Sequence, residues 1–172
     1  MVEIFENRIE VTNPGAPLVD LRRFVDTPPK SRNERLASLM RRIGVCEERG
    51  SGWDRIVFQT ELFRLPPPLI ESYENHTKVV LFAHQVLTKM DKADRVRATY
   101  LHACLRHVSR ESTNNTSVRE RFGIEVKNSA MASRLIREAV EAGVIVPYDA
   151  SASPKLMRYV PFWAAPSQGS FT

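Results

Sequence analysis

Apolar and polar residues alternate at the start of the chain, which is the two-residue period of a β-strand. Two such runs cover residues 2–6 and 8–12, meet at Glu6 and Asn7, and predict a β-hairpin. The pattern ends at Asn13-Pro14-Gly15, after which a proline-rich loop is expected to about residue 31. Because a strand that opens at residue 2 needs a partner, we also expect the sequence to be part of a longer protein.

Two helices are predicted next, because apolar residues then recur every three or four positions. The first begins after Asn33, a good capping residue, and ends at Gly44. The second precedes Pro66. Their apolar residues are Leu36, Leu39, Met40 and Ile43 in the first, and Trp53, Ile56, Val57 and Phe63 in the second. Residues 70–73 and 78–82 have strand patterns, so residues 1–84 are expected to form an α+β unit with a mixed or antiparallel sheet.

Helical spacing is more regular in the second half of the chain. Helices are predicted from Asp94 to about Val108, over residues 116–122, and from Asn128 to about residue 142. The apolar face of the first helix carries Val96, Tyr100, Leu101, Cys104, Leu105 and Val108, and that of the third carries Ala132, Leu135, Ile136, Ala139 and Val140. Between Phe82 and Asp94 there is no glycine or proline, so a short helical or extended connector is expected.

A second β-hairpin is predicted after these helices, with strands over residues 144–148 and 156–160. The short middle helix is expected to be capped by Asn115 or Thr116 and to stop at Gly123, which leaves a tight turn before the third helix. Three helices followed by a hairpin are the element order of a winged helix-turn-helix. The expected domains are therefore an α+β unit over residues 1–84, a winged helix over residues 90–165 and a frayed tail over residues 166–172.

Charge is distributed unevenly between the two halves. Residues 1–80 hold 12 Lys and Arg against 12 Asp and Glu, whereas residues 81–172 hold 13 against 8, so the net charge of +5 lies in the second half. An excess of cations on one domain favours a polyanionic partner. A solvated basic surface would have the same composition.

The third helix of the second half is the strongest candidate for contact with duplex DNA. In a helix-turn-helix, the N-terminal side chains of the last helix reach base edges in the major groove. Asn128 and Arg134 can pair with adenine or guanine, Lys127 and Arg137 suit phosphates, and Ser129 and Ser133 are small enough for close approach. We expect Arg119 and Arg121 before this helix, and Lys155 and Arg158 in the hairpin, to hold the DNA backbone.

Two alternatives remain open for this domain and for the first one. The winged helix could serve for dimerisation or for docking of a protein, with Arg134 and Arg137 paired to Glu138 or Glu141. In the first half, glycine-bearing loops at Asn13–Gly15 and at Arg49-Gly50-Ser51-Gly52 could bring backbone N–H groups against phosphates, although glycines of turns and helix caps are the commoner explanation. A homodimer of this chain is compatible with the DNA-binding role, because winged helices often bind two-fold DNA sites as dimers.

Several classes of function are disfavoured. No apolar run is long enough to span a membrane and no signal peptide opens the chain, so a cytoplasmic protein without a membrane partner is expected. Cys46 and Cys104 are far apart and suit small buried side chains better than a disulfide or zinc site. The four histidines, His76, His84, His102 and His107, show no metal-ligand spacing, and no catalytic motif is present. No catalytic residue, metal or certain cofactor is expected.

The first half nevertheless resembles a known family. Residues 2–14, Ser31-Arg32-Asn33 and above all residues 41–56, which read RRIGVCEERGSGWDRI, are similar to the C-terminal domain family of RecG-type ATP-dependent DNA helicases. Members of that family are mostly transcriptional regulators of bacterial type, with an N-terminal Schlafen-type AlbA (divergent AAA) domain and often a terminal winged helix. The resemblance covers roughly residues 2–82.

This resemblance implies a partial fold of the histidine-kinase and gyrase type of ATPase. In such a fold Asn13–Gly15 and Gly50–Gly52 would lie at two nucleotide loops, and ATP with magnesium would bind to the full-length protein. Two departures are visible: Ala16 stands where the family usually has a second glycine, and the upstream helix with its magnesium-facing and catalytic groups is absent. The resemblance therefore implies a regulator fragment without ATP hydrolysis of its own, and no Walker or helicase motif is present.

Overall fold

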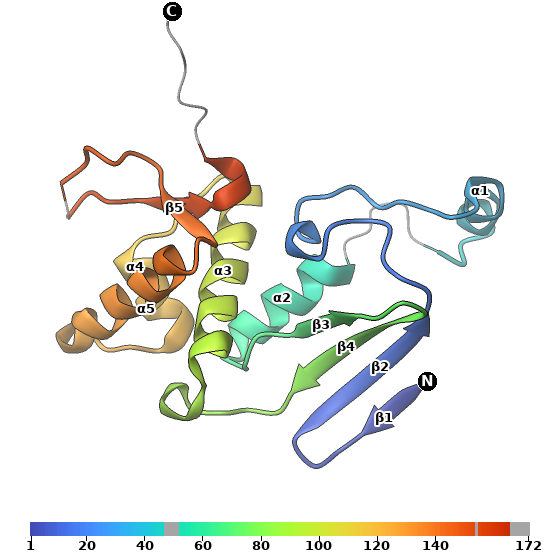
Figure 1. Cartoon of the computed structure of the whole chain (residues 1–172), viewed down its shortest axis with the longest axis horizontal. Coiled ribbons are helices and arrows are strands. Elements are labelled where there is room, and N and C mark those ends of the chain that lie inside the picture. The colour runs from blue at the N-terminus through green and yellow to red at the C-terminus, as the bar shows by residue number, and fades with distance from the viewer. Residues whose placement is uncertain (47–51, 154, 166–172) are drawn as a thin grey trace, which may run out of the picture.

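The computed structural model describes residues 1–46, 52–153 and 155–165. The described part of the first half contains a four-stranded antiparallel sheet in the order β1-β2-β4-β3 (Figure 1). Its strands are β1 (Val2–Ile4), β2 (Arg8–Pro14), β3 (Leu69–Ser72) and β4 (His76–Phe82). The predicted N-terminal hairpin is confirmed, because Ile4 pairs with Ile9. The antiparallel alternative for the sheet is also confirmed.

The two faces of this sheet differ in chemistry, because residues paired across strands share a face. One face carries Val2, Ile4, Ile9, Val11, Ile70, Val79 and Leu81. On the other face, Glu10 is buried between Arg8 and Lys78, at 2.6 and 2.8 Å. Hydrogen bonds from Lys78 and then from Arg8 lower the pKa of Glu10. At the edge of the apolar face, Ile4 is 79% exposed.

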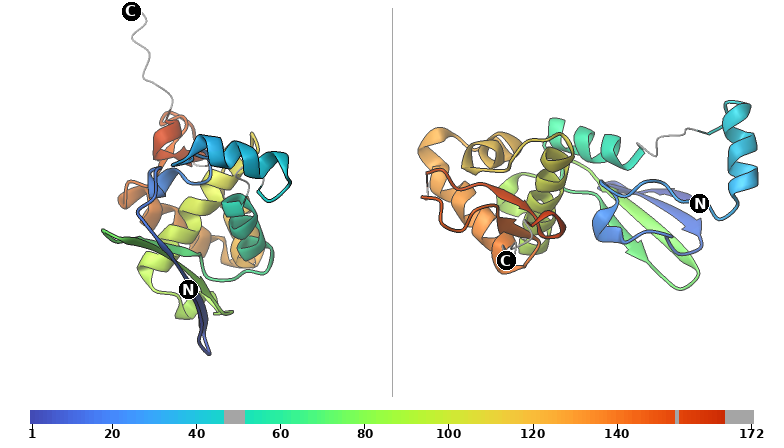
Figure 2. Two further views of the ribbon diagram at one scale, coloured as in Figure 1. Left: turned by 90° about the vertical axis from the view of Figure 1, so that its right-hand side faces the viewer. Right: turned by 90° about the horizontal axis from the view of Figure 1, so that it is seen from above.

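Helix α1 (Glu34–Arg42) begins where the sequence predicts, because the Asn33 side chain accepts a hydrogen bond from the N–H of Leu36 at 3.0 Å. Its apolar side is not covered, however: Leu36, Leu39 and Ile43 are all more than half exposed. Figures 1 and 2 show α1 at the end of the molecule away from the C-terminal helices. The sequence pattern thus predicts the helix correctly but says nothing about what covers it.

Helix α2 (Gly52–Leu62) has a different environment, since Val57 is fully buried. After β4 the connector contains a short 3-10 helix, η2 (Leu87–Lys89), which agrees with the predicted short helical or extended connector. The remaining elements are α3 (Lys92–Val108), α4 (Asn115–Phe122), η3 (Val126–Asn128), α5 (Ser129–Glu141), β5 (Ile145–Pro147), β6 (Tyr159–Pro161) and η4 (Phe162–Ala164). The predicted three helices and terminal hairpin are all present in this order.

The cap of α4 differs from the predicted one. Asn114, rather than Asn115 or Thr116, accepts a hydrogen bond from the N–H of Ser117 at 3.0 Å, and the Ser117 hydroxyl accepts one from the Asn114 N–H at 3.1 Å. This reciprocal pair is a capping box. Gly123 ends the helix in the left-handed region as predicted. Thr113, just before the cap, pairs with Tyr159 of β6, so the hairpin is joined to the segment between α3 and α4.

One hydrophobic cluster joins the two halves of the chain. Val25 and Val57 from the first half belong to the same buried cluster as residues of α3, α4, α5 and β5. The loop after β2, which contains η1 (Leu21–Arg23), is also attached there: the Tyr100 hydroxyl donates a hydrogen bond to the Arg22 carbonyl, and Trp163 Nε1 donates to the Tyr100 hydroxyl at 3.1 Å. Among the described residues, no helix is long and apolar enough to cross a membrane. The predicted tail, residues 166–172, lies outside the described residues.

Candidate functional site

Helix α5 has one side in the core and one side free. Ala132, Leu135, Ile136 and Ala139 are buried, as the sequence predicts. The predicted contact residues around its start are exposed: Lys127, Asn128, Ser129, Ser133, Arg134 and Arg137. In the hairpin, Lys155 and Arg158 are exposed as well. Lys127 forms an ion pair with Glu125 at 2.7 Å, but its side chain remains 75% exposed. Eight of the predicted residues therefore lie on accessible surface.

The two arginines of α5 are only loosely engaged by carboxylates. Arg134 Nε lies 3.9 Å from Glu138, and Arg137 Nε lies 3.9 Å from Glu141, both beyond hydrogen-bond distance. Glu138 is held instead by Arg95 of α3, at 3.1 Å. The two pairs at 3.9 Å, Arg134 with Glu138 and Arg137 with Glu141, therefore contribute little to the stability of the fold. The guanidinium groups of Arg134 and Arg137 are thus available to an external partner.

Asn115 joins α4 to α5, a role that the sequence analysis missed. Its Nδ2 donates to the Ser129 carbonyl and to the Ser133 hydroxyl, both at 2.9 Å. Arg119, which is half-buried, donates from Nε to Asn115 Oδ1 at 3.2 Å and so lies beside the residue that contacts the start of α5. The sequence signal for this role is the pair of adjacent asparagines, Asn114 and Asn115. Because Asn114 caps α4, the side-chain amide of Asn115 can bond to another element.

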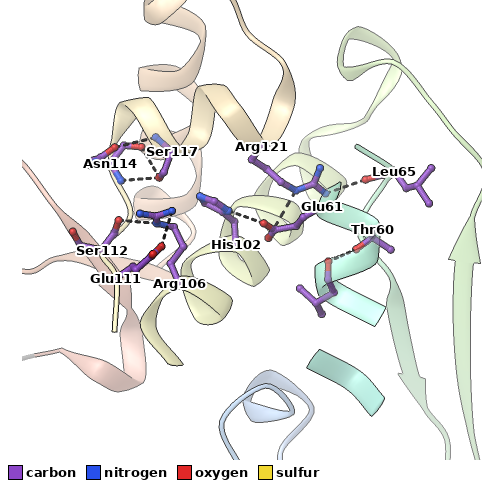
Figure 3. A network of polar contacts seen from close by, with 11 residues as sticks. Thr60, Glu61, Leu65, His102, Arg106, Glu111, Ser112, Asn114, Ser117 and Arg121 are labelled. Atoms are coloured by element: carbon purple, nitrogen blue, oxygen red, sulfur yellow. Dashed lines mark hydrogen bonds and ion pairs between the residues drawn. The ribbon is translucent and has the colours of Figure 1, made fainter. Parts of the chain in front are cut away.

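Arg121 does not lie where we predicted, and the expectation of a DNA contact is corrected. Its side chain is only 2% exposed and turns into the protein, where Nη2 donates to the Leu65 carbonyl at 2.9 Å (Figure 3). Glu61 of α2 lies 3.9 Å from Arg121 Nε and 3.0 Å from His102 Nδ1. Burial lowers the pKa of Arg121, and the charge of Glu61 opposes that effect. The hydrophobic period of α4 could not predict the burial of Arg121, because its partners Leu65 and Glu61 lie 56 and 60 residues earlier in the sequence.

A cavity of about 720 Å³ lies at the first predicted glycine loop. Asn13 and Gly15 line it, together with Lys30, Arg32 and Trp53. Gly15 has a φ of 89°, its N–H donates to the Asn75 carbonyl, and its own carbonyl accepts from the Thr77 hydroxyl at 2.7 Å. This backbone conformation favours glycine. The loop is thus fixed at the wall of the cavity.

Only the end of the second predicted glycine loop belongs to the described residues. Arg49, Gly50 and Ser51 lie outside the described residues, whereas Gly52 begins α2 and is followed by Trp53 at the cavity wall. Among the described lining residues there are cations, Lys30 and Arg32, but no carboxylate. The described chain also contains no group of three or more His, Cys, Asp or Glu residues that could hold a metal ion. The cations Lys30 and Arg32 suit contact with a phosphate group.

The fold therefore comprises an α+β part with a cavity at a glycine loop, followed by a helical part with a hairpin and a basic surface. Residues 1–81 match the family model described as "Putative ATP-dependent DNA helicase recG C-terminal". This match relates the α+β part to that family and confirms the predicted resemblance at this level. No match was found among curated proteins or solved structures.

Proposed function

We propose that residues 92–161 form a winged helix that binds duplex DNA through α5 and the β5–β6 hairpin, within a transcriptional regulator. The observation that carries this proposal is the position of the cations. Arg134 and Arg137 project from the exposed side of α5, whose other side is fixed in the core. Lys155 and Arg158 are exposed on the hairpin that follows. Cations on both elements suit a duplex whose groove receives α5 and whose backbone lies against the hairpin.

The small residues at the start of α5 support close approach. Ser129, Ala130 and Ser133 are exposed, so no large side chain separates this end of the helix from a base edge. The side chain of Asn115, in α4, donates hydrogen bonds to the Ser129 carbonyl and the Ser133 hydroxyl, which fixes this end of α5. We therefore assign base reading to Asn128 and Arg134, and phosphate contact to Lys127 and Arg137.

A protein-docking role is less well supported by this surface. A docking helix needs an exposed apolar patch at the centre of its interface. Within α5, which the structure describes in full, no large apolar side chain is exposed; those flanking it in sequence are Val126 in η3 and Tyr148 and Leu156 in the hairpin region. The chemistry of α5 thus favours a polyanion over an apolar partner.

The test is a double variant with a matched control. Arg134→Ala with Arg137→Ala should weaken binding to duplex DNA and reduce the slope of log K against log salt by about 0.9 for each phosphate that the variant no longer neutralises. The control, Arg35→Ala with Arg42→Ala, removes the same charge from exposed positions of α1 and should leave binding nearly unchanged. Fluorescence anisotropy measures both variants against random duplex DNA and DNA upstream of the protein's own operon.

Single variants separate base reading from phosphate contact. Arg134→Ala should lose about 1–3 kcal/mol of discrimination between sequences, whereas Arg137→Ala should weaken all duplexes alike. Unchanged binding by the double variant, with its fold intact by circular dichroism, contradicts the assignment of α5. Absence of any binding by the parent chain at about 50 mM salt contradicts the proposal as a whole.

We also infer a nucleotide site in the 720 Å³ cavity, supported by Gly15, Lys30 and Arg32 in its lining. We expect ATP to bind with its phosphates against Lys30, Arg32 and the Gly15 loop. Trp53 lines the cavity and lies edge-on to Phe24 at 5.9 Å, so its fluorescence is a direct probe. Titration of Trp163→Phe protein with ATP should change the Trp53 signal saturably. A flat titration, with and without magnesium, contradicts this site.

A further inference from the structure

A cavity of about 240 Å³ lies between α5 and the β5–β6 hairpin, and it is separate from the 720 Å³ cavity at the glycine loop. Figure 1 shows the hairpin beside α4 and α5, at the end of the molecule away from α1. Most of the lining is apolar and comes from α5 and the hairpin: Ile136, Val140, Pro147, Met157 and Tyr159. The polar lining residues are Asn115, Ser133 and Arg137. Since two of these belong to the proposed DNA surface, the cavity borders that surface.

Asn115 determines which hydrogen-bonding groups the cavity offers. Its Nδ2 donates both hydrogens at 2.9 Å, one to the Ser129 carbonyl and one to the Ser133 hydroxyl. Its Oδ1 accepts from Arg119 Nε at 3.2 Å. Because a guanidinium group only donates, this contact fixes the amide with its NH2 group toward α5. Asn115 therefore has no free N–H for an occupant, and the Ser133 hydroxyl is held as an acceptor.

Ser133 is left with one hydrogen to donate. A hydroxyl group has one hydrogen and two lone pairs, and Asn115 occupies one of the lone pairs. Within the described part of the chain, no acceptor is bonded to the Ser133 hydroxyl hydrogen. The residue is exposed, so an occupant of the cavity can reach this hydroxyl.

Arg137 supplies the only charge among the described lining residues. Its side chain is 68% exposed, and its Nε lies 3.9 Å from Glu141, which is 59% exposed. That pair is solvated and beyond hydrogen-bond distance, so Glu141 competes only weakly with an occupant. Residues four apart on a helix lie on the same side, with their Cβ atoms about 5–6 Å apart. Ser133 and Arg137 can therefore donate to the two oxygens of one carboxylate.

We propose that this cavity binds a small monocarboxylate with an apolar body. Both polar contacts are donors and one is a cation, which selects an anionic acceptor. The body covers Met157 and Tyr159, and a small acid fits because sites for drug-sized ligands typically begin at about 300 Å³. Since Ser133 and Arg137 also belong to the DNA surface, the acid and a duplex exclude each other. This exclusion rests on the proposed DNA binding, whereas binding of the acid does not.

The test adds cyclohexanecarboxylate to the full chain. Amide signals of Ser133, Arg137 and Met157 in ¹H–¹⁵N spectra should shift saturably, with a dissociation constant of about 1–10 mM for a ligand of this size. Cyclohexanecarboxamide keeps the body without the charge, and acetate keeps the charge without the body. Each should bind at least about tenfold more weakly. If either binds as well as the acid, the charge or the body plays no part and the proposal is overturned.

Dimethyl phosphate represents the other source of an anion, the DNA backbone. It lacks the apolar body, so it should also bind more weakly than cyclohexanecarboxylate. Tighter binding of dimethyl phosphate would assign the cavity to the DNA backbone and overturn the proposal.

Variants locate the binding. Arg137→Gln should remove the preference for the acid over the carboxamide. Met157→Asp places a carboxylate against the apolar body and should weaken the acid at least about tenfold. Leu156→Asp is the matched control and should change binding less than about twofold, because Leu156 is 69% exposed and is not a lining residue. An equal loss in both hairpin variants would mean that charge on the hairpin, and not contact with Met157, weakens the acid, and would overturn the proposed site.

Anisotropy of labelled duplex DNA tests the exclusion. At about ten times its own dissociation constant, the acid should weaken DNA binding about tenfold by mass action. The same concentration of sodium acetate keeps the ionic strength equal and should have a much smaller effect. If the acid binds and the duplex remains bound, the exclusion is wrong. If the parent chain binds the acid but no duplex, only the DNA proposal fails. No saturable shift with the acid overturns the inference and leaves the DNA titration unaffected.

Discussion

Gly123 shows how one backbone angle constrains a residue. It ends α4 with a φ of 64°, where a side chain is disfavoured. A Cβ there would also lie 2.5 Å from the end of the flexible Arg64 side chain, which would have to move. We expect Gly123→Ala to lower the free energy of unfolding by about 1 kcal/mol. Urea denaturation measures this, with Gly52→Ala as the control. Gly52 lies in α2 with open space around it, so an equal loss in both variants would contradict this explanation.

The two cysteines differ in environment, and their reactivity should differ accordingly. Burial raises the pKa of Cys104 to about 12, so its thiol remains protonated at neutral pH, whereas Cys46 is exposed. Since the thiolate is the reactive form, we expect a disulfide reagent at pH 8 to modify Cys46 rapidly and Cys104 only on unfolding. Absorbance of the released thiol, compared between the parent chain and Cys46→Ser, measures the two rates. Rapid labelling of Cys46→Ser would contradict the buried position of Cys104.

At the scale of elements, helix ends depend on specific side chains rather than on helix period alone. Asn114 and Asn128 both precede helices, but only Asn114 makes a side-chain cap. Asn114→Ala should therefore lower stability by about 1 kcal/mol, and Asn128→Ala should have little effect. Thermal unfolding followed by circular dichroism compares them. If the order of the two losses were reversed, the assignment of Asn114 as the cap would be wrong. Asn128→Ala is also predicted to weaken DNA binding, which separates its role from that of Asn114.

Helix α1 and the sheet show that amphipathicity does not by itself imply burial. Leu36, Leu39 and Ile43 have the spacing of a core-facing helix, and yet all three are exposed. Ile4 and Val2 at the β1 edge are likewise exposed. The same period in α5 buries Leu135 and Ile136 fully or nearly so. What differs is the presence of neighbouring elements, which the period of one helix does not encode.

At the scale of the whole molecule, the connector between the sheet and α3 is fixed in place. Met90 is 4% exposed, Arg95 Nη1 donates to its carbonyl at 2.7 Å, and Gln85 Nε2 donates to the Lys89 carbonyl at 2.7 Å. Trypsin should therefore cut slowly after Lys89 and Lys92, because cleavage requires local unfolding. Lys155, exposed near the tip of the hairpin, is the internal control and should be cut sooner. Mass spectrometry orders the fragments, and early cleavage at Lys89 would indicate independently moving halves.

The sequence by itself determined the order of elements, most of their bounds and the exposed cations of α5. Hydrophobic period, caps and glycine stops are local properties, and they are read over a few residues. The resemblance over residues 2–82 was likewise visible in the sequence and is matched over residues 1–81.

Only the tertiary structure decided which side chains meet across the chain. Arg121 carries the same charge as Arg119 two residues earlier, but it bonds to Leu65 and faces Glu61, so it is buried. Local sequence patterns likewise do not predict the contact between Glu61 and His102 or the exposure of Leu39. The physical reason is that burial depends on contacts between residues far apart in sequence, and the free energy of those contacts outweighs the local preference of a charged side chain for water.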